Sequence, residues 1–496
     1  MGIVIKQSFN NLITTYLGFA IGALNTLFLY TNFMSEQYYG LVSFIVSTAM
    51  ILMPFMAFGV QNTLVKFYSA YEGKEQSVFL NWMLLLPLLV AIPGALICFF
   101  FYEQIALFLS IKNEIVYNYV WYIFIIAVSS SYFEVFFAWA KVQFKTIFGN
   151  FMKEVFHRLG ITLLLVLLAF HLITIDTFLI ALVFVYVARM LVMSIYAYNL
   201  KQPKFIRHTI RSIRTPSKRP QNFMAIIKYT TLIIIAGSVA SLLLDLDKVM
   251  LGLYEEIENV AFYSVAIYIA TVIAVPARAM HQITYPMVAK MLNEKQYDEM
   301  RKLYHKSSLT LFVIASLLFL LIICNLESLY DMVIKSYSAG FYVVLFIGAA
   351  KLLDNCLGIN NAILYNSDYY RIILVLGVLL VIVAIILNTV FIPLFGINGA
   401  AIATFVASVL YTIFKIIIVY KKFGMQPFTK ASLKTLILLV VFFAAFYFWD
   451  FSFHPFVNII LKSIVLGASY VLAIYFLNIS SDVTTAIQSI LKRKAL

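Results

Sequence analysis

Long apolar stretches alternate with short polar ones along the whole chain. Fourteen of them are long enough to cross a bilayer, since a spanning helix needs about 20 apolar residues. They are expected at residues 9–31, 39–60, 79–101, 117–138, 155–173, 177–198, 227–251, 259–282, 307–329, 340–362, 370–394, 397–419, 431–451 and 456–477. Because a backbone in lipid must satisfy its own hydrogen bonds, we predict helices and not the alternating strands of a barrel. The expected fold class is an all-α polytopic membrane protein with 14 transmembrane helices.

The composition agrees with this pattern and excludes several classes of protein. Of the 496 residues, 63% are apolar and 12% are charged, whereas a soluble domain has about 45–50% and about 25%. An ordinary soluble enzyme, a disordered tail and a nucleic-acid module are therefore excluded. The net charge of +14 does not indicate nucleic acid as a partner, because the position of the basic residues explains it.

Basic residues gather on one side of the predicted membrane. The segments on that side, with the adjoining helix ends, hold 29 of the 36 lysines and arginines, and the opposite loops hold only Lys112 and Lys335. Cytoplasmic loops carry such an excess. Both termini are therefore predicted to be cytoplasmic.

The longest basic stretch, residues 199–226, predicts the domain organisation. The stretch 39–43 (YGLVS) is similar to 260–264 (VAFYS), 221 residues later, and two similar halves are common in transporters. We predict a six-helix bundle over 1–198, a cytoplasmic linker over 199–226, a second six-helix bundle over 227–423, and helices 13 and 14 with a tail over 424–496. An ordinary positive-inside linker is favoured for 199–226 over a site for anionic membrane lipids.

Charged side chains inside the predicted helices are the first candidate site residues. Ionisable groups at membrane depth are costly unless they are paired or face water, so they mark a pathway by default. We single out nine within our boundaries: Glu134, Arg189, Asp245, Asp247, Lys248, Arg278, Lys351, Asp354 and Lys462. Arg278 follows the helix-breaking Pro276 and lies near His281, so we predict that it is a cavity cation.

Uncharged polar residues extend these positions into faces. In the helix at 340–362 one stripe contains Lys351, Asp354, Asn355, Gly358 and Asn361 at helical spacing. The first helix carries Asn10 and Asn25 on a polar face, and the seventh carries Asp245 and Lys248. The simplest arrangement turns these faces toward a shared hydrated cavity.

Structural roles remain as alternatives for several of these residues. Lys351 and Asp354 are suitably spaced to neutralise each other. Glu134 and Arg189 could form a structural ion pair between helices. Asp245, Asp247 and Lys248 could be an interfacial cluster, and Lys462 could extend its ammonium group to the interface.

Motifs for other chemistries are missing. The sequence has no G-x-x-x-x-G-K-[ST] nucleotide loop, no H-E-x-x-H and no G-x-S-x-G. The three cysteines and the histidines show no metal or disulfide spacing. We therefore expect no cofactor, no metal and no enzyme activity. A membrane glycan polymerase or ligase is a weak alternative, because such enzymes generally keep catalytic residues in larger outer loops.

Four local sequences carry a resemblance to a known family. They are 30–41 (YTNFMSEQYYGL), 247–252 (DKVMLG), 262–266 (FYSVA) followed by Pro276 and Pro286, and 395–404 (FGINGAAIAT). Together they resemble the polysaccharide-biosynthesis (Wzx-type) exporters of the multidrug/oligosaccharidyl-lipid/polysaccharide superfamily. With the fourteen helices, the resemblance covers nearly the whole chain.

The resemblance implies a function and a set of site residues. It implies a flippase of the bacterial cytoplasmic membrane that moves oligosaccharide on undecaprenyl pyrophosphate to the outer leaflet by alternating access, for O-antigen, capsule or exopolysaccharide, with a polysaccharide polymerase as an expected partner. Cations would hold the pyrophosphate, and amides would bind sugar hydroxyls. The cavity candidates are Arg278, His281, Lys351, Asp354, Asn355, Asn361, Arg189, Glu134, Asn10 and Asn25; the candidates for coupling to H⁺ or Na⁺ are Asp245, Asp247 and Lys248.

Two departures from related families refine this interpretation. Lipid II flippases of the superfamily carry several arginines in their first two helices, and this chain has none there. Drug antiporters usually have twelve helices, so the additional pair favours the polysaccharide branch. A Na⁺- or H⁺-coupled multidrug antiporter remains the alternative function.

Overall fold

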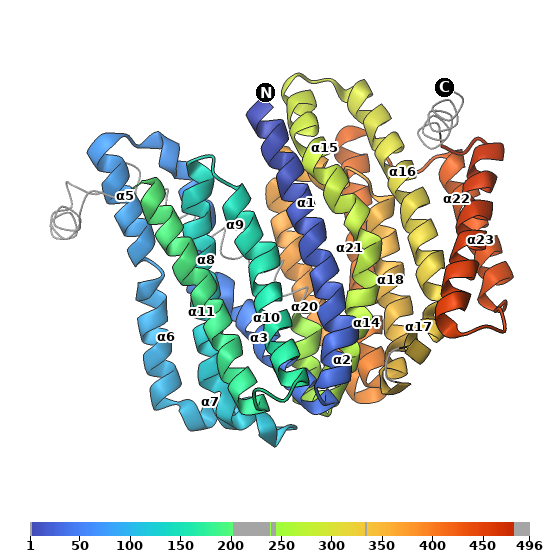
Figure 1. Cartoon of the computed structure of the whole chain (residues 1–496). Helices are drawn as coiled ribbons and strands as arrows, with labels where there is room; N and C mark the ends of the chain where they lie inside the picture. The colour runs from blue at the N-terminus through green and yellow to red at the C-terminus, as the bar shows by residue number, and fades with distance from the viewer. Residues whose placement is uncertain (1, 202–238, 240–244, 333–334, 481–496) are drawn as a thin grey trace. The chain divides into compact units, whose positions relative to one another are not determined.

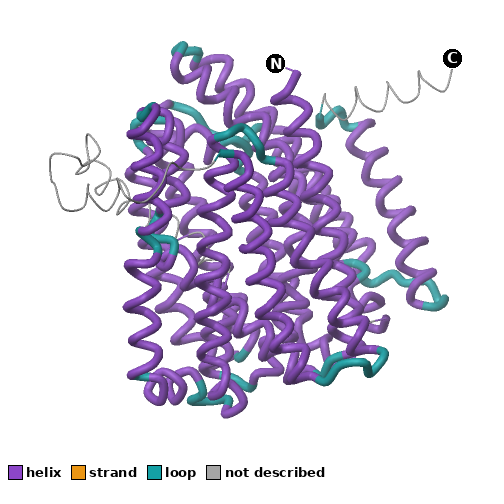
Figure 2. Tube along the Cα trace, turned by 60° about the vertical axis from the view of Figure 1, so that its left-hand side comes forward, coloured by secondary structure: helices purple, strands orange, loops and turns teal. Residues whose placement is uncertain are grey.

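The chain forms helices throughout the residues that the structure, a computed structural model, describes: 2–201, 239, 245–332 and 335–480. These residues contain no strand (Figure 2). Twelve of the helical segments are long and apolar enough to cross a membrane, and they correspond to twelve of the fourteen predicted helices. The predicted helix at 155–173 appears as shorter pieces, and that at 227–251 lies mostly outside the described residues. The protein is therefore a multi-pass membrane protein, whereas fourteen helices and cytoplasmic termini stay predictions.

The chain divides into two compact units, Met1–Ala261 and Phe262–Leu496. Only residues 199–201 of the predicted linker are described, and the predicted domain boundaries stay predictions. The helices of the first unit are α1 (Gly2–Leu24), η1 (Asn25–Leu29), α2 (Tyr30–Phe33), α3 (Glu36–Met56), α4 (Val60–Phe67), η2 (Tyr68–Ala70), α5 (Gly73–Leu85), α6 (Leu88–Phe100), α7 (Tyr102–Leu109), η3 (Glu114–Tyr119), α8 (Val120–Val142), α9 (Ile147–Phe151), η4 (Met152–Phe156), α10 (His157–Ala169) and α11 (Ile175–Leu200).

The first helix of the second unit, α14, begins a few residues before the division between the units. The helices of this unit are α14 (Ile257–Thr271), η6 (Val272–Ala274), α15 (Val275–Asn293), α16 (Tyr297–Ile323), α17 (Leu326–Met332), η7 (Lys335–Gly340), α18 (Phe341–Cys356), α19 (Asn360–Asn366), α20 (Tyr370–Phe395), α21 (Ile397–Phe423), α22 (Lys430–Tyr447) and α23 (Pro455–Phe476).

One central helix organises each unit. In the first unit α8 packs against α3, α4 and α11, and most of its side chains are buried. Small residues in its middle, Ser129 to Ser131, allow neighbouring helices to approach closely. In the second unit α18 packs against α16 and α21, and α20 covers the other side of α21. The site carboxylates Glu134 and Asp354 lie on α8 and α18, respectively.

The last two helices attach to the second unit through a buried polar group. Figure 1 shows α22 and α23 side by side, and they pack on α16 and α17. Lys462 on α23 is buried and lies 2.9 Å from Asp450, while Asn458 bonds both Asp450 and Ser328. Partial burial raises the pKa of Asp450, but the hydrogen bonds from Asn458 and Lys462 outweigh it and hold that pKa below its ordinary value. Lys462 is therefore neutralised in place.

Several spanning helices are interrupted. The chain breaks between α3 and α4 at Gly59, which has φ of 64°, and between α18 and α19 at Gly358, which has φ of 52°. Between α14 and α15 the helix tightens into the 3₁₀ turn η6 before Pro276. The chain widens into the π-helical turns η1, which follows α1, and η4, which lies between α9 and α10. Such interruptions in membrane helices free backbone groups and are tolerated where protein or water satisfies them.

Gly358 has two reasons to be glycine. Its left-handed φ disfavours other residues, and a Cβ there would lie 2.6 Å from the backbone nitrogen of Ser308. We predict that Gly358→Ala destabilises the protein by at least about 1–2 kcal/mol, because the strain of the left-handed conformation alone amounts to that. The measurement is the free energy, or the melting temperature, of thermal unfolding in detergent.

Gly467 provides the matched control. It lies within α23, and a Cβ there would meet no atom within 4 Å. Gly467→Ala should leave stability unchanged or raise it by up to ~1 kcal/mol. Equal melting temperatures for the two variants would contradict the proposed constraint at Gly358.

Candidate functional site

A partly buried ion pair marks the end of α18 in the second unit. Lys415 Nζ on α21 lies 3.1 Å from Asp354 Oδ1 and 3.2 Å from Asn361 Oδ1, and 4.6 Å from the centre of the Tyr411 ring. The Lys415 side chain is 1% exposed, whereas that of Asp354 is 52% exposed. Because an exposed carboxylate on a spanning helix is costly in lipid, we expect the Asp354 side chain to face water. The pair therefore has a sealed cation and an accessible anion.

The break after α18 brings further predicted residues to this pair. His281 on α15 lies with Nε2 3.2 Å from the carbonyl oxygen of Gly358, and its ring meets Tyr285 edge-on. The Asn355 amide donates to the carbonyls of Ile273 and Lys351. These bonds join the interruption of α18 to that between α14 and α15.

Two polar atoms near this break have no partner within the described residues. The side-chain oxygens of Asn355 and Asn360 are buried and accept no hydrogen bond. Leaving each such group unsatisfied costs about 1–3 kcal/mol, and neither oxygen is accessible to a ligand in this structure.

Two other predicted cations belong to this region. Arg278, three residues before His281, is exposed, and within the described part of the chain its guanidinium has no ion pair. Lys351 lies one turn before Asp354 on α18 and is half-buried. Whether Lys351 neutralises Asp354, as the spacing allows, stays a prediction.

A second charged cluster lies in the first unit. Glu134 on α8 pairs with Lys153 on η4 at 2.7 Å, and the Lys153 side chain is 42% exposed. Arg189 on α11 donates to Ser130 Oγ at 3.2 Å and stacks on the rings of Phe133 and Tyr186. The ion pair of Glu134 is thus made with Lys153, and Arg189 is held by aromatic faces.

The π-helical turn η4 adds another pair to this cluster. Arg158 on α10 lies 3.9 Å from Glu154. With Lys153 and Arg189, the cluster has three cations against two carboxylates. Lys141, also on α8, lies over the Phe137 ring at 4.0 Å. The balance of charge in this part of the first unit is therefore positive.

Asn25 bonds the first turns of α10 and does not present a free amide. Its Nδ2 donates to the carbonyl of Arg158 at 2.9 Å, and its Oδ1 accepts from Thr162 at 2.7 Å. Gly18 lets α1 approach the Glu154 backbone, since a Cβ there would lie 2.5 Å from its carbonyl oxygen. Asn25 therefore fixes the first turns of α10, the helix that follows η4. The side chain of Asn10 is half-buried, and its carbonyl accepts from Thr14.

The three ion-coupling candidates lie together at the described end of the seventh helix. Ser47 Oγ on α3 donates to Asp245 Oδ1 at 2.9 Å, and Lys248 Nζ lies 3.5 Å from the same oxygen. Asp247 is buried. The structure places this group in the first unit, with the charge of Asp245 already met by Lys248.

The two charged clusters repeat one arrangement. Asp354 follows Glu134 by 220 residues, close to the 221-residue offset of the sequence repeat. In each unit the carboxylate lies on the central helix, and a buried cation on the last helix of the bundle, Arg189 or Lys415, lies against an aromatic ring. The buried cation pairs with the central carboxylate only in the second unit, because Glu134 pairs with Lys153 in the first.

Sequence reasoning missed Lys415 and Lys153. Both lie near predicted helix ends, where they were counted among the cytoplasmic basic residues. A signal for Lys415 was present, because Tyr411 precedes it by one helical turn on an otherwise apolar helix. Among the described residues, no group of three or more His, Cys, Asp or Glu side chains could hold a metal ion.

Solved structures share this fold. The lipid II flippase MurJ in an inward closed conformation is similar with a TM-score of 0.70 and 15% identity, over 95% of this chain and 99% of that chain. An inward-facing MATE multidrug transporter is similar with a TM-score of 0.56 and 14% identity, over 84% of this chain and 94% of that chain. A MOP superfamily transporter from Pyrococcus furiosus is similar with a TM-score of 0.56 and 12% identity, over 85% of this chain and 96% of that chain. It is described as having a binding pocket of reversed polarity.

The sequence comparison identifies the family. No curated protein matches the sequence. The family model described as polysaccharide biosynthesis protein matches residues 5–292, which is more than half of the chain. This match confirms the family resemblance, and three of the four local sequences lie within the matched residues. The chain belongs to the polysaccharide biosynthesis protein family.

Proposed function

We propose that the protein is a flippase that moves oligosaccharide linked to undecaprenyl pyrophosphate from the inner to the outer leaflet of a bacterial cytoplasmic membrane by alternating access. Its family and the fold shared with the lipid II flippase support a transporter of this kind. The observation that carries the proposal is the sealed Lys415 ammonium with its accessible Asp354 partner. A polysaccharide polymerase would use the oligosaccharide on the outer leaflet.

The ion pair is suited to exchange one anion for another. A pyrophosphate cannot cross hydrocarbon without compensation of its charge, and a buried lysine provides a fixed cation with three donors. In this structure Asp354 and Asn361 accept from Lys415. Because the Asp354 carboxylate is the accessible partner, an arriving phosphate oxygen can replace it while the lysine stays in place. Arg278, which is exposed and lies three residues before His281, would add a second cation.

The sign of both clusters favours an anionic cargo over a cationic drug. Three cations against two carboxylates surround η4, and Lys351 and Lys415 accompany the single carboxylate Asp354. Organic cations would be repelled by such an excess. Coupling to H⁺ or Na⁺ through Asp245 or Asp247 remains a proposal for the energy source, although Lys248 already neutralises Asp245.

The function is tested by transport in proteoliposomes. We expect the purified protein to flip a fluorescent undecaprenyl-pyrophosphate oligosaccharide, measured by the fraction of label that dithionite quenches in the outer leaflet. Ethidium, assayed in the same vesicles under a Na⁺ or H⁺ gradient, should not be transported. Gradient-driven ethidium efflux without glycolipid flipping would assign the protein to the antiporters.

The role of Lys415 is separable from its contribution to folding. Lys415→Met should lower the flipping rate by at least about tenfold, which corresponds to an activation free energy raised by about 1.4 kcal/mol. It should also destabilise the protein, because Asp354 loses its partner. In the double variant Lys415→Met with Asp354→Asn, the melting temperature should recover because no charge remains unpaired. Flipping should stay lost.

The control is Lys421→Met, which removes an exposed lysine six residues later on α21. It should flip at the wild-type rate. If the double variant regains transport together with stability, Lys415 is a structural residue and the proposed phosphate contact is wrong.

A further inference from the structure

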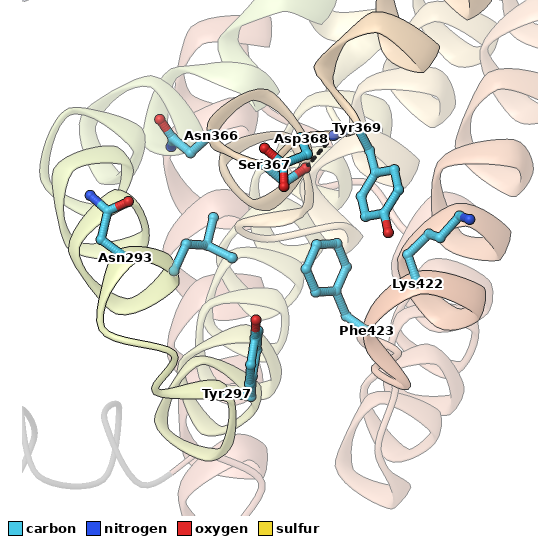
Figure 3. A pocket seen from close by; sticks show the side chains of 9 residues that line it. Asn293, Tyr297, Asn366, Ser367, Asp368, Tyr369, Lys422 and Phe423 are labelled. Carbon is cyan, nitrogen blue, oxygen red and sulfur yellow. Dashed lines mark hydrogen bonds between the residues drawn. The ribbon is translucent and has the colours of Figure 1, made fainter.

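A pocket of about 490 Å³ lies at the end of the second unit, away from the ion pair along α19. Its walls come from the end of α15, the start of α16, the α19–α20 connection and the end of α21 (Figure 3). The basic residues of the surrounding loops predict that this end is cytoplasmic. Its volume falls in the range of small-molecule sites, about 300–1,000 Å³.

Aromatic rings form two of the pocket walls. Tyr297 at the start of α16 is 44% exposed, and Tyr369 stands edge-on to Phe423 with the ring centres 5.8 Å apart. Lys422 Nζ lies 4.9 Å from the centre of the Tyr369 ring. Accessible rings at a polar site offer flat apolar faces with a hydroxyl at the edge.

Amide and carboxylate groups complete the pocket. The Asn366 amide donates to the carbonyls of Tyr285 and Ala362, so its side-chain oxygen is directed as an acceptor. Asn293, Asp368 and Lys422 line other parts of the wall (Figure 3). Asp368 is exposed and makes no ion pair within the described residues, although Lys422 lines the same pocket.

This combination fits a carbohydrate. A sugar ring has apolar C–H faces, which pack on aromatic rings, and hydroxyl edges, which need both donors and acceptors. Seven of the nine lining residues carry a polar side-chain group. An apolar drug would leave these groups without partners, at about 1–3 kcal/mol for each buried one. The chemistry of the walls therefore selects a polyhydroxylated ligand.

We propose that this pocket is a glycan subsite that binds the outer sugars of the oligosaccharide at the cytoplasmic side, a step that rests on the proposed function. The short helix α19 connects it to the ion pair. Asn361 at its start bonds Lys415, and Asn366 at its end lines the pocket, five residues or about 7.5 Å apart along the axis. A sugar bound in the pocket thus contacts the same helix that helps to hold the proposed phosphate cation.

The test compares two lipid substrates of different glycan length. The probes are undecaprenyl pyrophosphate carrying chitotriose and the same lipid carrying a single N-acetylglucosamine. Tyr297→Ala should raise the half-saturating concentration of the chitotriose lipid about tenfold, leave its maximal rate within about twofold, and leave the single-sugar lipid unaffected. Asp368→Asn should act in the same direction.

The control variant is Tyr420→Ala, which removes a 61% exposed tyrosine of α21 that does not line the pocket. It should behave as the wild type with both lipids. A Tyr297→Ala variant that transports the chitotriose lipid with unchanged half-saturation, or that weakens both lipids equally, would overturn the glycan subsite and leave the flippase proposal standing.

Direct binding separates the two proposals. Saturation-transfer difference NMR with the full-length protein in nanodiscs should show contacts to free chitotriose or maltotriose that Tyr297→Ala abolishes and Tyr420→Ala retains. If the wild type flips neither lipid but binds the free sugars in this way, the proposed function fails, and the pocket is a glycan-binding site without the role in flipping. Equal NMR signals from wild type and Tyr297→Ala overturn the subsite.

Discussion

A charge buried in a membrane helix must have a partner or water, and this constraint shapes the second unit. The Lys415 side chain is almost fully enclosed, where an unpaired ammonium is strongly disfavoured. Asp354 provides the counter-charge, and Asn361, which lies on α19 beyond the break at Gly358, bonds the same nitrogen. The left-handed backbone at the break favours glycine, and His281 bonds the Gly358 carbonyl. The interruption, the amide and the ion pair are therefore one arrangement.

The first unit meets the same constraint with different residues. Glu134 occupies the place of Asp354 on the central helix, and Arg189 lies among aromatic rings as Lys415 does. Its accessible ion is the cation Lys153, whereas in the second unit it is the carboxylate. Both clusters retain more positive than negative groups. Such clusters can compensate the charge of an anion, which hydrocarbon cannot do, so both are suited to the transport of an anionic substrate.

The sequence predicted the spans well because apolar length is a direct requirement of the bilayer. The stretch 397–419, for example, lies within α21 at 397–423. The interruptions were not predictable from hydropathy, since residues 57–59 and 357–359 are as apolar as their neighbours. The helix expected at 155–173 begins earlier and passes through a π-helical turn, and its next segment, α10, is bonded by Asn25 of another helix.

For the site residues too, some features could be predicted from spacing within one helix and others could not. Asp354, Asn355 and Asn361 share a helical spacing, and the structure brings them to one break. Asn25 was expected to offer its amide to a ligand, yet both ends of that amide are used by α10. Lys415 joins Asp354 across 61 residues, and a contact of that kind arises from the packing of α18 on α21. Spacing within one helix was informative, whereas partners on other helices required the fold.

The central claim is that the Lys415 ammonium exchanges Asp354 for a phosphate of the lipid-linked substrate. It is tested most directly by a cryo-EM structure of the protein in nanodiscs containing an undecaprenyl-pyrophosphate oligosaccharide. The account predicts a phosphate oxygen within about 3 Å of Lys415 Nζ, with the Asp354 carboxylate moved away from it. A bound headgroup elsewhere, with the Lys415–Asp354 pair still closed, would contradict the account.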